Sequence, residues 1–153
     1  MLFRSARISG AVYDRVCRVA MGYQPAAEET AIVERELAGA VPGRAFLDGV
    51  VEVTRLTRSH PDLRVGSSVR GAVDFAKVAA SLAGIRGAAQ DDAGVSLDAA
   101  LVSLSGRVRV REGSSRTAEE IVTEIWNSVF GPKQEDGSGG GKGGAPTRGT
   151  TSR

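Results

Sequence analysis

The chain has 153 residues, of which 41% are hydrophobic, and a formal net charge of +2. This length suffices for one domain with a hydrophobic core, and so small a charge does not by itself indicate nucleic-acid binding. One cysteine and one histidine exclude an intrachain disulfide and a Cys- or His-rich metal cluster. No run of about 18 apolar residues is present and the first residues are too polar for a signal peptide, so we expect a cytoplasmic protein.

The N-terminal region predicts a short strand and then a helix. Residues 13–23 alternate in part between apolar and polar side chains, which is typical of a strand. Within it, Cys17 is expected to be a small buried side chain. Pro25 at the first helical position, followed by acidic residues, predicts a helix. Its apolar spacing continues to Ala40, and Val41-Pro42-Gly43 ends it.

Two longer helices are expected next. Residues 44–59 form an amphipathic helix that ends at His60-Pro61, and residues 62–67 are expected to be a loop. A third helix runs from about Val69 to Ala83, with Gly84 as its C-cap. The predicted core face of the 44–59 helix consists of Phe46, Leu47, Val50, Val51 and Thr54.

The C-terminal third predicts two more helices around a short strand. Residues 86–94 are expected to be a loop, and Ser96 is expected to cap a helix from Leu97 to Leu104. Arg107–Glu112 alternates strictly, which predicts a short exposed strand. Thr117 and Glu120 fit a capping box that opens the last helix, closed by Gly131-Pro132.

The remaining features of this region concern the core and the tail. Trp126 is expected to be a core anchor of the last helix. Residues 131–153 hold eight of the 20 glycines and no large apolar side chain, so they are expected to be a disordered tail. The predicted fold class is therefore mainly α: a helical bundle with one or two short strands and a disordered C-terminal tail.

Few residues could carry chemistry. The sequence has no Gly-rich loop ending in Lys and Ser or Thr, hence no P-loop, and no Walker B motif. Ser68 is a predicted N-cap, which places Arg70 in the first helical turn, where a cation opposes the helix dipole by about 0.3–1 kcal/mol. Helix N-termini favour anions, so Arg70 and the free N–H groups of the first turn could both face a phosphate. Alternatively, Arg70 points to solvent or pairs with Asp74.

Other arginines are weaker candidates. Arg15 follows Tyr13-Asp14 and could contact phosphate, or it could be a surface side chain paired with Asp14 or a nearby glutamate. Arg107, Arg109 and Arg111 could contact nucleic-acid phosphates, or they could belong to a solvated edge strand that is protected by charge.

Three stretches of the chain carry a resemblance to a known family. Residues 13–36, YDRVCRVAMGYQPAAEETAIVERE, look like an LDRF segment, a strand with a Gly-Tyr-Pro turn, and a Glu-rich helix. Residues 50–87, VVEVTRLTRSHPDLRVGSSVRGAVDFAKVAASLAGIRG, resemble a lid signature of ATR-x-HP followed by LGASPR. Residues 97–126 are similar to a C-terminal extension of some actinobacterial-type members. Together they resemble the C-terminal part of the MoxR family of AAA+ ATPases.

The resemblance implies three parts. Residues 1–23 correspond to a remnant of the AAA+ core, with the arginine-finger segment and a strand. Residues 24–130 correspond to the helical AAA+ lid domain with its extension, and residues 131–153 to the Gly-rich tail. The nucleotide-binding half of the family is missing from this sequence.

The resemblance also implies roles for single residues. Arg70, next to Ser68 in the cofactor site, matches the sensor-2 arginine that touches the ATP γ-phosphate. Arg15 matches the catalytic arginine finger, which reaches the ATP of a neighbouring subunit and stabilises the transferred phosphoryl group. Arg58 matches the ATR arginine, with a local structural role. Where the family has a proline before the sensor arginine, this chain has Val69.

The family's activity implies partners. ATP is the expected cofactor, with Mg supplied by the missing half and no metal ligand in this chain. Other MoxR-type subunits would form a hexameric ring with chaperone-like remodelling activity, and a von Willebrand factor A domain protein is a further partner. No membrane partner is expected. Alternatives are a stand-alone helical adaptor or inhibitor of an intact MoxR ATPase, and a small nucleic-acid-binding domain.

Overall fold

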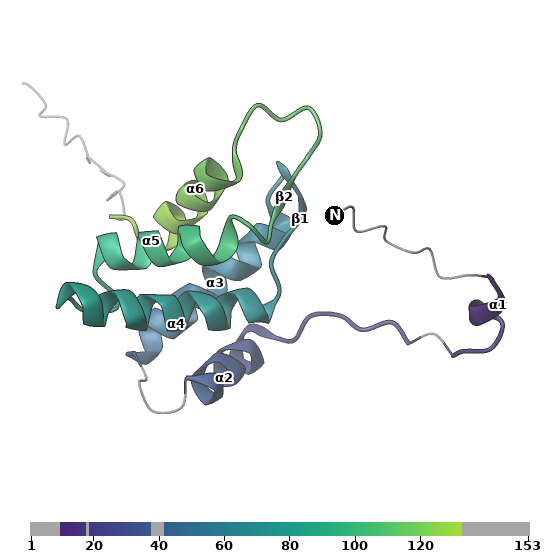
Figure 1. Cartoon of the computed structure of the whole chain (residues 1–153), viewed down its shortest axis with the longest axis horizontal. Coiled ribbons are helices and arrows are strands. Elements are labelled where there is room, and N and C mark those ends of the chain that lie inside the picture. The colour runs from purple at the N-terminus through teal and green to yellow at the C-terminus, as the bar shows by residue number, and fades with distance from the viewer. Residues whose placement is uncertain (1–9, 18, 38–41, 133–153) are drawn as a thin grey trace, which may run out of the picture.

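The structure is a computed structural model that describes residues 10–17, 19–37 and 42–132. Within them, six helices and two short strands follow one another: α1 Gly10–Tyr13, α2 Ala26–Glu36, α3 Arg44–Ser59, β1 Leu63–Val65, α4 Val69–Arg86, α5 Ala93–Leu104, β2 Arg109–Val110 and α6 Ala118–Phe130. The helices α2 to α6 pack into a bundle, whereas residues 10–17 and 19–25, which we call the arm, extend away from it (Figure 1). The predicted mainly helical fold is confirmed, and the expected tail lies beyond the described residues from position 133 on.

The first two bundle helices follow their local signals closely. α3 has the predicted bounds, and its predicted core face is buried. α2 begins one residue later than expected, because Pro25 is the N-cap and not the first helical residue. The helix ends at Glu36, with Leu37 as its C-cap. The predicted continuation to Ala40 lies outside the described residues.

α4 is longer than predicted, because the wrong glycine was expected to end it. Gly84 lies within the helix, and the C-cap is Gly87, whose φ of 63° is in the left-handed region. Only glycine adopts this conformation without a steric penalty. Small side chains on α4, such as Ala76 and Ala79, face the core, and this allows α5 to pack close against α4.

α5 begins earlier than predicted. Its N-cap is Asp92, whose carboxylate accepts a hydrogen bond from the Val95 N–H at 3.0 Å. Ser96, the predicted cap, is instead buried in the first turns of the helix. An aspartate is as good an N-cap as a serine, so the sequence offered two start signals and the earlier one prevails.

The two short strands pair with each other. β1 and β2 are antiparallel, with Leu63 opposite Val110 and Val65 opposite Arg109. The loop expected over residues 62–67 therefore contains a strand, and the strand expected over Arg107–Glu112 is reduced to two residues. A strand needs a partner for its backbone hydrogen bonds, and the partner of β1 lies far along the chain.

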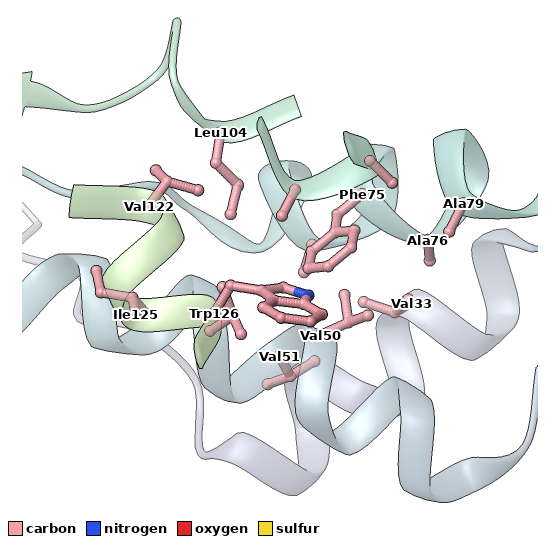
Figure 2. Close-up of a cluster of buried hydrophobic side chains, with 14 of the residues drawn as sticks. Val33, Val50, Val51, Phe75, Ala76, Ala79, Leu104, Val122, Ile125 and Trp126 are labelled. Carbon is pink, nitrogen blue, oxygen red and sulfur yellow. The ribbon is translucent and has the colours of Figure 1, made fainter. Parts of the chain in front are cut away.

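The core lies between the five bundle helices. The capping box is confirmed: Thr117 Oγ1 accepts from the Glu120 N–H, and the Glu120 carboxylate accepts from the Thr117 N–H. Trp126 is buried, as predicted, and lies among side chains of α2, α3, α4 and α5 (Figure 2). Its ring centroid is 5.7 Å from that of Phe130, which in turn is 5.7 Å from Phe46.

The prediction of a strand over residues 13–23 is wrong for the part that the structure describes. Gly10–Tyr13 forms one helical turn, and no strand is assigned to residues 14–17 and 19–23. Cys17 is exposed and not buried. Alternating apolar side chains form a strand only against another strand, and none of the described residues pairs with this segment.

Candidate functional site

The N-terminus of α4 carries the predicted phosphate-facing residues. Ser68 occupies the N-cap position in extended conformation, but its side chain makes no capping hydrogen bond. The first turn instead closes through the backbone, where the Gly71 N–H donates to the Ser68 carbonyl at 2.8 Å. Arg70 is exposed in this turn, with no acidic residue beside it in the first turn. The positive end of the helix dipole and a guanidinium therefore occupy the same exposed end of α4.

Asp74, the predicted alternative partner of Arg70, is engaged elsewhere. It forms an ion pair with Arg107, which also donates from Nε to the Ser103 carbonyl at 3.0 Å. This pair ties α4 to the end of α5. Among the described residues no ion pair of Arg70 is found, so its exposed position is the one that the structure supports.

Arg15 lies in the arm, directly after α1. It is exposed, and its Nη1 donates to the carbonyl of Ala11 at 2.9 Å. The predicted pairing with Asp14 is not among the ion pairs of the described residues. α1 lies away from the bundle (Figure 1), so the structure does not bring Arg15 and Arg70 together at one place. The two candidate arginines therefore occupy separate exposed positions and do not share one pocket.

A buried carboxylate joins α2 to α3, and no local pattern of the sequence predicts its burial. Glu29 in α2 is 1% exposed. Its Oε1 is 2.9 Å from Arg58 Nη2, and its Oε2 accepts from Arg55 Nη1 at 3.0 Å and Arg58 Nη1 at 3.2 Å. A buried carboxylate is costly unless it is paired and hydrogen-bonded. Both arginines come from α3, so this contact fixes α2 against α3.

Arg58 makes two further contacts, with segments on either side of α3. Its Nε donates to the carbonyl of Ser67, just before α4, at 2.7 Å. Its guanidinium carbon lies 3.9 Å from the ring centroid of Tyr23 in the arm, which is a cation–π contact. Arg55 adds a bond from Nη1 to the Gln24 carbonyl at 2.9 Å. We call Tyr23, Glu29, Arg55 and Arg58 the Glu29 cluster.

The sequence predicted only part of the Glu29 cluster. Arg58 was expected to have a local structural role, which its contacts fit. Glu29 was interpreted as a first-turn acid that favours the start of a helix, and it does lie in the first turn of α2. Its burial depends on α3 covering it, and no local pattern reports such a contact between helices.

The basic residues around β2 are largely engaged within the chain. Arg107 pairs with Asp74, and Arg109 Nη1 donates to the carbonyls of Gly106 and Val108 at 3.0 and 2.9 Å. Only Arg111 of the three is exposed without a side-chain bond among the described residues. Among the described residues only Arg107 of the three is neutralised by a carboxylate, because the partners of Arg109 are uncharged carbonyls. The positive charges of Arg109 and Arg111 therefore stay available to a nucleic-acid phosphate.

A second ion-pair cluster joins α6 to the turn after α3. Arg116 donates to Asp62 at 3.2 Å and to Glu124, and His60 Nε2 lies 3.5 Å from Glu124. The hydrogen bond from Arg116, with a smaller contribution from His60, lowers the pKa of Glu124. The same bond raises the pKa of Arg116. These groups are partly exposed and neutralise one another, which is typical of a structural surface cluster.

Two properties of the described residues bear on the expected partners. No group of three or more His, Cys, Asp or Glu side chains is placed to hold a metal ion within residues 10–17, 19–37 and 42–132. Over the same residues, no helix has both the length and the apolar character that crossing a bilayer requires.

The chain was compared with known proteins on three levels. No protein-family model, no curated protein and no solved structure matches it. A function for the chain therefore has to be argued from its own residues and their geometry.

Proposed function

We propose that residues 1–153 act as the lid, with an arginine-finger arm, of a cytoplasmic MoxR-type AAA+ ATPase. The observation that best supports this proposal is the exposed Arg70 in the first turn of α4, beside a Ser68 that leaves the helix N-terminus uncapped by a side chain. A cation at this end opposes the helix dipole unless an anion is bound there.

The two arginines would act on different nucleotides. Arg70, with Ser68 and the N–H groups of the first turn of α4, would contact the γ-phosphate of an ATP held by the nucleotide-binding half of the ATPase. Arg15 would reach the ATP of the next subunit in a hexameric ring and stabilise charge that develops on the transferred phosphoryl group. Bound ATP with its Mg supplies the reactive phosphoryl group. The P-loop and acidic metal ligands that hold it are absent from this sequence, so the residues described here would position and not bind it.

The arm supports the same proposal. Val16, Val19 and Met21 are exposed large apolar side chains on a segment without a partner among the described residues. Their burial against a nucleotide-binding half would gain free energy from each apolar surface that leaves water. In the proposed assembly, the ring performs chaperone-like remodelling, together with a von Willebrand factor A domain protein.

Reconstitution in trans tests this proposal. The purified chain is mixed with the separately expressed nucleotide-binding half of a MoxR-type ATPase, and ATP hydrolysis is measured at saturating chain. We expect stimulation by the wild-type chain and a loss of at least about tenfold of that stimulation for Arg70→Ala and Arg15→Ala. Arg64→Ala, an exposed arginine on β1, is the matched control and should stimulate normally.

Two outcomes would contradict the proposal. The first is a complex on size-exclusion chromatography that hydrolyses ATP no faster than the nucleotide-binding half alone. The second is full stimulation by Arg70→Ala. The exposed apolar arm also favours an adaptor that docks on an intact MoxR ATPase, and co-migration with the intact enzyme, without stimulation of the separate half, would support that second function.

A further inference from the structure

The contacts of Arg58 link the two segments that carry the candidate phosphate-facing arginines. The arm carries Arg15, and the turn before α4 leads to Arg70. The Tyr23 ring is 3.9 Å from the Arg58 guanidinium carbon on the arm side, and the Ser67 carbonyl accepts from Arg58 Nε at 2.7 Å on the α4 side. One side chain therefore touches both segments at once.

The link is rigid because the guanidinium has little freedom. Arg58 is 11% exposed, and its Nη1 donates to Glu29 Oε2 at 3.2 Å. Its Nη2 lies 2.9 Å from Glu29 Oε1 as an ion pair without a hydrogen bond. A buried planar fork that is held by one hydrogen bond and one ion-pair contact presents its Nε and its face in fixed directions. Lysine could keep the positive charge next to Glu29. It has, however, no second donor that points toward Ser67 and no planar face for the Tyr23 ring.

The α4 side of the link is equally constrained. The Ser67 N–H donates to Thr57 Oγ1 at 2.9 Å, and a Cβ on Gly66 would lie 2.5 Å from the Arg58 Cα. The backbone before α4 thus lies directly against the last turn of α3. A displacement of Arg58 cannot be absorbed by a flexible loop here, so it would reach Ser67 and the start of α4.

We propose that Arg58 is a positioning residue that couples the direction of the arm to the N-terminus of α4, with Glu29 as its anchor. The coupling means that a change in the arm is transmitted to the turn that holds Ser68 and Arg70, and the reverse. Its use in ATP hydrolysis rests on the proposed function, because only there do Arg15 and Arg70 serve nucleotides. The coupling itself is a property of this chain and can be measured without nucleotide.

The chain carries its own reporters for this measurement. Cys17 is the only cysteine and is exposed in the arm, and Trp126 is the only tryptophan and is buried in the bundle. Energy transfer from Trp126 to an acceptor dye on Cys17 reports the distribution of arm positions. Hydrogen exchange at the Ser67 amide reports the turn before α4.

Arg58→Lys is expected to change both reporters. The distribution of Trp126–dye distances should broaden, and the Ser67 amide should exchange about five- to tenfold faster. The reason is that loss of the Arg58 bond to the Ser67 carbonyl removes about one hydrogen bond that resists opening of this turn, in which the amide donates to Thr57 Oγ1. Tyr23→Ala should broaden the distance distribution and also speed Ser67 exchange, though less than Arg58→Lys does, since it removes the arm contact from the guanidinium that bonds the Ser67 carbonyl. Met21→Ala, in the same arm and 87% exposed, is the matched control and should change neither.

Two results would overturn the proposal. One is an Arg58→Lys protein with native circular dichroism in which only one reporter changes, or neither. The other is an unchanged distance distribution or an unchanged Ser67 exchange in Tyr23→Ala, a variant in which the ion pair stays intact, so it answers the question even when Arg58→Lys fails to fold. Because neither measurement contains ATP, a wrong assignment of Arg15 or Arg70 would not alter these outcomes.

Discussion

The arm and the bundle contain similar apolar residues, which are exposed in the arm and buried in the bundle. In the arm, Val19 is 79% exposed and Met21 87% exposed, whereas in the bundle Val33 and Phe75 are fully buried. The difference does not come from the side chains, because valine is found in both. It comes from the presence of neighbouring elements: the bundle helices cover one another, and the arm contacts the bundle at its C-terminal end, through Tyr23 and Gln24 and through the Pro25 carbonyl at the start of α2. An apolar pattern therefore predicts burial only where a partner surface exists.

The largest expected effect tests this contrast directly. Phe75→Ala should lower the free energy of unfolding by about 3–5 kcal/mol, because it leaves a cavity in a filled core next to Phe46. Met21→Ala should change it by less than about 0.5 kcal/mol. Urea denaturation of both variants measures the two values. An equal loss in both would show that the arm is packed as tightly as the bundle.

A close approach of backbones should be the next most sensitive feature. Gly66→Ala should lower the free energy of unfolding by about 1–3 kcal/mol, since its Cβ would overlap the backbone of Arg58. Gly84→Ala meets no atom within 4 Å and lies inside α4, so it should stabilise the protein by about 0.5–1 kcal/mol. Thermal melts of the pair should move in opposite directions, and a shift in the same direction would contradict the packing before α4.

The helix caps provide a test with a smaller expected change in stability, because one cap makes a side-chain hydrogen bond and the other does not. Thr117→Ala should lower the free energy of unfolding by about 1 kcal/mol, because it removes the accepted bond of the capping box. Ser68→Ala should have little effect on stability, since the Ser68 side chain makes no capping bond. Chemical denaturation compares the two. A large loss in Ser68→Ala would reveal a cap that forms in solution and would weaken the case for a free α4 N-terminus.

The smallest expected effect is a pH dependence at the surface of the bundle. Because the folded-state pKa of Glu124 is lowered by Arg116, its contribution to stability is present above the ordinary carboxyl pKa and is lost as the pH falls through the lower, folded-state value. The effect should be small, since both groups are partly exposed. Glu124→Gln should flatten this part of the stability curve below pH 4.5, and an unchanged curve would contradict the assignment.

Features that depend on a few neighbouring residues could be predicted. The bounds of α3 follow from its apolar spacing and from Pro61, and the start of α6 follows from the Thr117–Glu120 capping box. Where two local signals compete, the prediction was wrong: Gly87 and not Gly84 caps α4, and Asp92 and not Ser96 caps α5. Local chemistry allows both candidates, and packing between α4 and α5 decides between them.

For the candidate site, the sequence supplied the position of Arg70 on the first turn of a helix, and the structure places it there, exposed. The roles of Arg70 and Arg15 in ATP hydrolysis stay predictions. The Glu29 cluster was missed, because the burial of a charged side chain is fixed by a helix that lies some thirty positions further along the chain.

The sequence by itself determined that this chain is mainly helical, where three of its helices begin, and which side chains of α3 form the core, because these follow from the period of the helix and from local capping bonds. Only the tertiary structure decided that β1 exists, that Cys17 and the arm stay exposed, and that Glu29 is buried beneath Arg55 and Arg58. Each of these depends on which distant segment lies alongside, and that is set by the packing of whole helices and not by the neighbouring residues.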